Sequence, residues 1–174
     1  MGVPGWAVSL AFFPGIIAHE LSHVLICRLL RVQIVEVCYL DLDTAGGWVR
    51  HARPREAWKT VVIGMAPFGG NALMGSLVGA AGVALMGFAE VIGGLVLWVG
   101  GSAIIHSFPS RADFAGTVQA LRDPGTPLWL RVLSYPGLGL IWAGARASTL
   151  HVYVGMFYAA VLIALGCWAL GVGA

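Results

Sequence analysis

The chain has 174 residues, of which 59% are hydrophobic and only 10% are charged, and its mean hydropathy is +0.86. Soluble proteins carry about 25% charged residues, so this shortfall leaves too little polar surface to cover a soluble globule and predicts an integral membrane protein. The net charge of +2, without a basic run that includes interleaved aromatic residues, excludes nucleic acid as a partner.

The charged residues divide the chain into apolar stretches, and a helix needs about 20 apolar residues to cross a bilayer. Four stretches qualify, at about residues 3–30, 60–89, 91–108 and 152–172. A fifth, at 124–145, is weaker because Arg131 and Tyr135-Pro136-Gly137 divide it, so it is either a kinked span or an interfacial helix. We expect an all-α polytopic membrane protein, a single membrane domain over 1–174 with four to five transmembrane helices.

The first stretch contains the most informative motif, His19-Glu20-Leu21-Ser22-His23. Residues four apart share one face of a helix, so His19 and His23 offer two nitrogen ligands to a metal, with Glu20 beside them as a general base. An isolated histidine is more often a packed core residue, but three ionisable groups at bilayer depth are costly and need a compensating role. A cleaved signal peptide is disfavoured, because the stretch lacks a basic start and cleavage would remove the motif.

The segment after this stretch is rich in β-branched residues from 32 to 42 and continues through Gly46 and Gly47 to Trp48. This pattern predicts a β-hairpin or small sheet at 32–50, beside the metal helix. An open strand edge there would hold a peptide in extended form, whereas the alternative is a solvated interfacial loop.

Basic residues set the expected orientation. Nine of the ten lie after the first or the third stretch: Arg28, Arg31, Arg50, Arg53, Arg55, Lys59, Arg111, Arg122 and Arg131. Because lysine and arginine favour the cytoplasmic side, we expect the N-terminus outside and the motif toward the cytoplasmic face.

The remaining small residues concern packing. Gly75 and Gly79 form a GxxxG pattern in the second stretch, for which packing within the molecule is favoured over dimerisation.

Cys27, Cys38 and Cys167 are widely spaced and odd in number, so neither a disulfide framework nor a thiolate metal site is expected.

A catalytic zinc has three protein ligands and an open position, so the motif leaves one ligand to be found. The candidates are His106 and Asp113 at the end of the third stretch, with Asp113 preferred. A helix cap or a surface ion pair is the other reading of Asp113. His51 lies in the basic loop, and His151 starts the last stretch on the far side.

These motifs together resemble the site-2 protease family of intramembrane zinc metalloproteases. After the metal helix and the strand-containing loop, the segment from Gly64 through Ala66-Pro67 to Asn71 is similar to the family's Gly-Pro-x-x-Asn helix. The segment from His106 through Pro109 to Asp113 is similar to the Asn-x-x-Pro segment that leads to its Leu-Asp-Gly aspartate. The likeness covers about residues 10–120, the three-helix catalytic core, without a PDZ-like insert.

The resemblance implies roles for individual residues. His19, His23 and Asp113 would hold Zn²⁺, Glu20 would activate water, and Asn71 would lie near the substrate carbonyl. His106, which stands where the family often has Asn, would be a second-layer partner of the ligands or an alternative ligand. Ala66 replaces the family's Gly, Asn71 is one residue further from the Pro than usual, and no Gly follows Asp113.

The implied function is metalloprotease action on a transmembrane or membrane-anchored protein substrate. The alternatives are a membrane protein that binds or transports a metal, and an inactive protease relative that acts as a membrane-protein chaperone. Glu20 favours the enzyme, because a carrier needs no base next to its first histidine.

Overall fold

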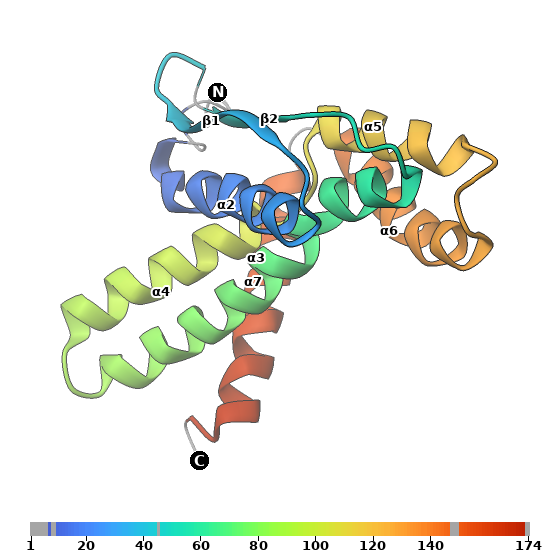
Figure 1. Ribbon diagram of the computed structural model, residues 1–174. Coiled ribbons are helices and arrows are strands. Elements are labelled where there is room, and N and C mark those ends of the chain that lie inside the picture. The colour runs from blue at the N-terminus through green and yellow to red at the C-terminus, as the bar shows by residue number, and fades with distance from the viewer. Residues whose placement is uncertain (1–6, 8–9, 45, 147–149, 173–174) are drawn as a thin grey trace.

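A computed structural model describes residues 7, 10–44, 46–146 and 150–172, and Figure 1 shows the arrangement. This part of the chain contains six helices and one two-stranded sheet. In chain order they are α2 (Phe13–Leu29), β1 (Ile34–Asp41), β2 (Gly46–His51), α3 (Ala57–Met86), α4 (Glu90–Ile105), α5 (Arg111–Arg122), α6 (Leu128–Arg146) and α7 (Leu150–Leu170). The mostly helical fold with a small hairpin is confirmed, whereas the expected start of the first span at residue 3 lies outside the described residues.

The long helix α3 is the centre of the molecule. It packs against α2, α4, α5 and α7, and α4 folds back along its second half (Figure 1). The β-hairpin lies over α2 and contacts it through both strands. The helix α2 is therefore enclosed by the hairpin on one side and by α3 and α4 on the other.

Glycines allow α3 and α4 to approach backbone to backbone. A Cβ atom added at Gly75 would lie 2.6 Å from Cγ1 of Ile104 and 2.7 Å from the carbonyl oxygen of Gly100. At Gly79, an added Cβ would lie 2.6 Å from Cγ1 of Ile163 in α7. Both glycines of the GxxxG pattern thus pack within the molecule, as expected.

Not every expected span has the length of a transmembrane helix. By length and composition, α3 is the one described helix that is long and apolar enough to cross a bilayer; α4 and the segment Phe157–Ala169 are apolar but shorter. The weaker fifth stretch forms α6, which continues through Pro136 instead of ending there. What is established is the helical fold with its hairpin, while the number of spans stays a prediction.

The hairpin pairs β1 with β2 in antiparallel register, with Val37 opposite Val49 and Cys38 opposite Trp48. Two irregularities in the register flank this central part. The chain enters β1 from α2 through Arg31, whose φ of 55° is left-handed and allows the tight reversal. The expected hairpin over 32–50 is confirmed.

The helix α5 was not expected as a separate element. It begins with a capping box, in which the Ser110 hydroxyl accepts from the backbone N–H of Asp113 at 3.2 Å and the Asp113 carboxylate accepts from the backbone N–H of Ser110 at 2.9 Å. Its apolar face joins a small core formed by Val61, Ala120, Leu121, Leu130 and Leu138. This core fixes α5 against the first turns of α3.

Substituting adjacent glycines of α4 tests the close approach of α3 and α4. An alanine Cβ at Gly100 would meet the backbone of Gly79 and the carbonyl oxygen of Gly75, the latter at 2.8 Å, whereas at Gly101 it would meet no atom within 4 Å. Overpacking costs about 1–3 kcal/mol, and Gly to Ala in a helix otherwise gains about 1 kcal/mol. We expect Gly100→Ala to lower the thermal unfolding midpoint in detergent and Gly101→Ala to keep or raise it. Equal midpoints for the two variants would contradict the packing described.

Candidate metal centre

The helix α2 positions the three residues of the motif. Pro14 lies in the first turn of α2, where the fixed φ of proline suits a helix start. One turn later α2 packs against its neighbours. His19, Glu20 and His23 are all buried, with exposed fractions of 8%, 7% and 5%. Such burial is unusual for ionisable side chains and requires partners.

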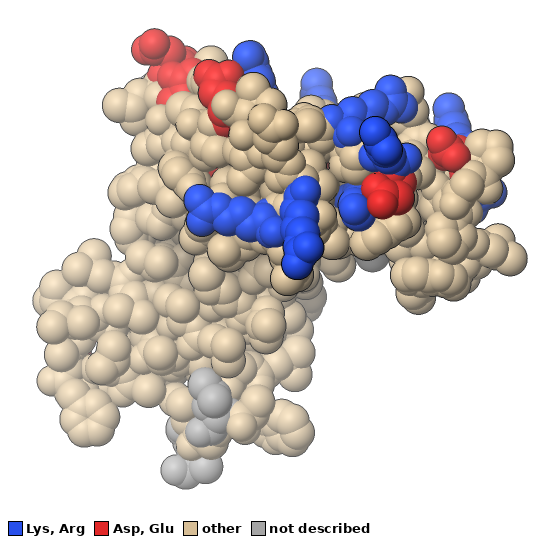
Figure 2. Space-filling model, in the orientation of Figure 1, with Lys and Arg blue, Asp and Glu red and all other residues tan. Residues whose placement is uncertain are grey.

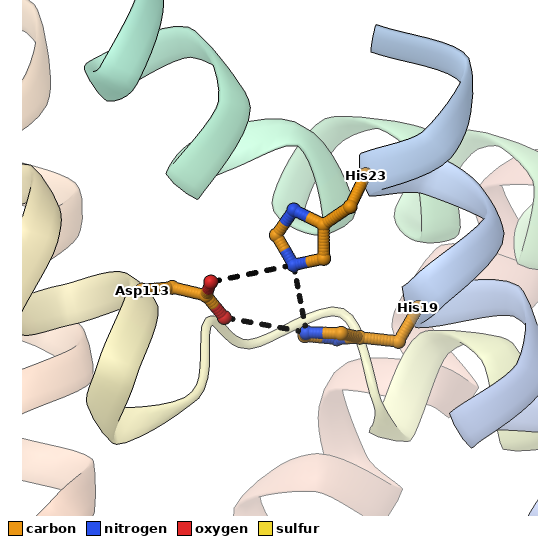
Figure 3. A group of neighbouring side chains, drawn as sticks. All are labelled: His19, His23 and Asp113. Atoms are coloured by element: carbon orange, nitrogen blue, oxygen red, sulfur yellow. Dashed lines mark hydrogen bonds and ion pairs between the residues drawn. The ribbon is translucent and has the colours of Figure 1, made fainter. Parts of the chain in front are cut away.

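Asp113 from the first turn of α5 meets the two histidines (Figure 3). Its Oδ2 lies 3.4 Å from Nε2 of His19, its Oδ1 lies 3.4 Å from Nε2 of His23, and the two Nε2 atoms are 3.2 Å apart. One ligand atom from each residue falls within 4.8 Å of the other two. Of the two candidates for the third ligand, the structure brings Asp113 into the group.

Two main-chain carbonyls orient the histidine rings. Nδ1 of His19 lies 2.7 Å from the carbonyl oxygen of His106, and Nδ1 of His23 lies 2.9 Å from that of Ile63. A carbonyl can only accept a hydrogen bond, so each Nδ1 carries the proton and donates it. Each neutral ring then turns an unprotonated Nε2 toward Asp113, which is the arrangement of histidines that bind a metal.

The residues present therefore fit a divalent metal. Without a cation, two nitrogen lone pairs and a carboxylate would face one another at contact distance, which is unfavourable unless a proton lies between them. The backbone N–H and the hydroxyl of Ser110 both donate to the Asp113 carboxylate, at 2.9 Å and 2.6 Å, and so favour its ionised form. Two imidazole nitrogens and an ionised carboxylate are ligands that Zn²⁺ accepts.

Comparison of the chain with protein-family profiles, curated protein sequences and solved structures found no match in any of the three.

A cavity of about 210 Å³ opens beside the metal-ligand group, between β2, α2, α3 and α5. Its lining includes Glu20, His23 and Asp113 together with Trp48, Thr60 and Thr117. The cavity is large enough for several water molecules. The cavity can hold both an attacking water and part of a ligand next to Glu20.

Gly47 of β2 brings the hairpin backbone directly over Glu20. An added Cβ would lie 2.6 Å from Cγ of Glu20 and 2.9 Å from the carbonyl oxygen of Cys38. The sequence predicts Gly46 and Gly47 only as part of the hairpin, because the contact with Glu20 joins residues far apart in the chain and has no local signal. The glycine is required because a side chain there would displace the proposed base.

Asn71 lies next to the motif but inside the helix packing, with an exposed fraction of 0%. Its side-chain N–H donates to the Ser22 hydroxyl of α2 at 2.6 Å, and its side-chain oxygen accepts from the backbone N–H of His19 at 3.2 Å. These contacts hold α3 against α2 at the motif. They give Asn71 a positioning role, and its expected place near a substrate carbonyl stays a prediction.

The other histidines occupy different positions. The His106 ring is turned away from the ligand group, because its Nδ1 donates to the carbonyl oxygen of Ser102 at 3.0 Å, so the residue supports His19 through its backbone. His51, at the end of β2, lines the cavity. The side chain of His151 lies outside the described residues.

Removing Asp113 should weaken metal binding while removing the His106 ring should not. We expect Asp113→Ala to lower zinc affinity by about a hundredfold or more. Even a residue that only hydrogen-bonds to a metal ligand contributes about tenfold to a hundredfold. His106→Ala keeps the backbone carbonyl and should bind zinc like the wild type. Competition with a chromogenic chelator measures both affinities. Normal binding by Asp113→Ala together with loss in His106→Ala would move the third ligand to His106.

Proposed function

We propose that this protein is an intramembrane zinc metalloprotease that hydrolyses peptide bonds of membrane-embedded or membrane-proximal protein substrates. The single observation that supports this most is the pair of carbonyl-oriented histidines, whose free Nε2 atoms converge with Asp113 beside the buried Glu20. A structural role for these residues alone would not require both nitrogens to face one carboxylate.

The distribution of side chains supports placement in a bilayer. On the face shown in Figure 2, the Lys, Arg, Asp and Glu side chains lie in the upper part, and the lower part, which holds the α3–α4 turn, shows none. Large apolar side chains are exposed along the second half of α3, α4 and α7, among them Leu73, Leu77, Phe88, Val91, Leu95, Phe157 and Trp168. Glu90, the first residue of α4, is exposed and would reach the opposite surface of the membrane. Lipid is the solvent that suits this surface.

The basic character of the other end supports a cytoplasmic location for the site. Lysine and arginine concentrate on the cytoplasmic side of membrane proteins, and Asp113 lies on α5, close to the arginine-rich connection between β2 and α3. In this orientation water reaches Glu20 and Asp113 from the cytoplasm. We also propose that the N-terminus lies on the non-cytoplasmic side of the membrane.

The chemistry assigns a step to each residue. His19, His23 and Asp113 would hold the zinc ion, which would supply a Lewis acid for a bound water and for the scissile carbonyl. Glu20 takes the proton of the attacking water and returns it to the leaving amine. His106 and Ile63 hold the histidine rings through their carbonyls, so that the ligands need no rearrangement.

Replacing the proposed base separates catalysis from metal binding. We expect Glu20→Gln to retain zinc and to lose cleavage by about a hundredfold or more, because the amide cannot accept the proton. The assay incubates purified protein with tagged single-span membrane peptides and detects products by mass spectrometry. Glu56→Gln is the matched control, since Glu56 is exposed and paired with Lys59 at 3.2 Å, and it should cleave normally.

The same assay discriminates the alternatives. Zinc binding without cleavage by the wild type would favour a metal carrier or a membrane-protein chaperone over an enzyme. Unchanged cleavage by Glu20→Gln would reject Glu20 as the base.

A further inference from the structure

A second cavity adjoins the cavity beside Glu20. It has a volume of about 280 Å³ and lies between the connection from β2 to α3 and the outer face of α5. His51, Thr60 and Gly116 line both cavities. We call the two adjoining cavities together the β2–α5 groove. A ligand that extends from Glu20 along the groove enters the second cavity next.

The outer end of the groove is basic. Arg53 and Arg55 line it, and both are exposed. Among the side chains that the structure describes, neither guanidinium has a carboxylate within ion-pair distance, whereas the nearby Arg50 pairs with Glu36 at 3.0 Å and Lys59 pairs with Glu56 at 3.2 Å. Two arginines remain available to an anionic ligand.

The one acidic residue in this lining offsets only one of the two positive charges. Asp123 at the end of α5 accepts a hydrogen bond from the backbone N–H of Gly125 at 2.8 Å. Its carboxylate thus closes the turn after α5. The wall of the outer cavity keeps an excess of positive charge.

The inner end offers hydrogen-bond groups that lack partners among the described residues. They are Nε1 of Trp48 and the hydroxyl of Thr117, and Thr117 has an exposed fraction of 1%. Both residues line the cavity beside Glu20. Buried polar groups are nearly always paired in native structures, so these two groups, on residues that line the cavity, each have a hydrogen bond left to donate.

We propose that the β2–α5 groove binds the substrate polypeptide on one side of the scissile bond and that Arg53 and Arg55 bind an acidic side chain of that segment. This inference rests on the proposed protease function. Trp48 and Thr117 take the peptide backbone near Glu20, and the guanidiniums take a carboxylate further along the same chain. Arginine presents a planar fork that matches a carboxylate, which favours Asp or Glu in the substrate.

A lipid headgroup is the competing anion at a membrane surface. The three lining residues that the two cavities share favour the polypeptide, because one extended chain can occupy both the cavity beside Glu20 and the adjoining cavity beside Arg53. A headgroup would occupy the outer cavity alone.

The test compares two sets of tagged transmembrane peptides, with an Asp-Asp or a Lys-Lys pair at successive positions after the cytoplasmic end of the span. Wild type and Arg53→Glu/Arg55→Glu are placed in nanodiscs of neutral lipid, and cleavage is measured. Binding is measured in the same proteins carrying Glu20→Gln. A charge-assisted contact contributes enough that the wild type should prefer the acidic peptide by about tenfold, and the double variant should prefer the lysine peptide.

Arg28→Glu/Arg122→Glu is the matched control. It changes the net charge equally, and both arginines are exposed and line neither cavity. It should keep the wild-type preference. A gain of preference for lysine by Arg53→Glu/Arg55→Glu also shows that this variant is folded.

The outcomes separate the two proposals. Cleavage without any charge preference overturns the groove assignment and leaves the protease function standing. Selective binding without cleavage supports the groove and rejects the protease chemistry. A charge preference that is the same in Arg53→Glu/Arg55→Glu as in the wild type also overturns the inference. So does an effect of the two arginines that is seen only with anionic lipid vesicles, which would assign them to a headgroup.

Discussion

The structure depends on two hydrogen bonds from histidine rings to main-chain carbonyls. The carbonyl of Ile63 belongs to α3, and the carbonyl of His106 belongs to the residue that ends α4. The rings of α2 are therefore oriented by two other helices, and a disturbance of either helix changes where an imidazole nitrogen points. This makes the ligand geometry a property of the three-helix packing and not of the motif alone.

Small residues make this packing tight enough to hold the carbonyls in place. A Cβ at Gly15 of α2 would collide with the Ser102 carbonyl and the His106 ring, and a Cβ at Gly70 of α3 would lie 3.0 Å from the Ser22 hydroxyl. Helices in lipid gain little from apolar burial against each other, so contact at backbone distance is an important source of their association. The same glycines thus stabilise the fold and position the ligands.

The sequence predicted the parts of the site that are local. The spacing of His19 and His23 placed them on one helical face, and the β-branched segment after them predicted the hairpin. Asp113 could be chosen as the third ligand because few residues are eligible. Its contact with both histidine rings could not be predicted, because that contact depends on how α5 docks. The contact of Gly47 with Glu20, and the groove between β2 and α5, arise from segments far apart in the chain. The Ser110-x-x-Asp113 spacing is a local signal for the start of α5. The sequence leaves open whether Asp113 is a cap or a ligand. In the structure Asp113 caps α5 and also lies in the group with His19 and His23.

The two roles of Asp113 would link metal binding to the formation of the first turn of α5. The carboxylate that faces the histidines also accepts from the backbone N–H and the hydroxyl of Ser110, at 2.9 Å and 2.6 Å, and so closes the first turn of α5. An ion held by His19, His23 and Asp113 would stabilise the start of α5 by mass action. Because α5 lines the groove, metal loading would then be thermodynamically coupled to the assembly of that lining.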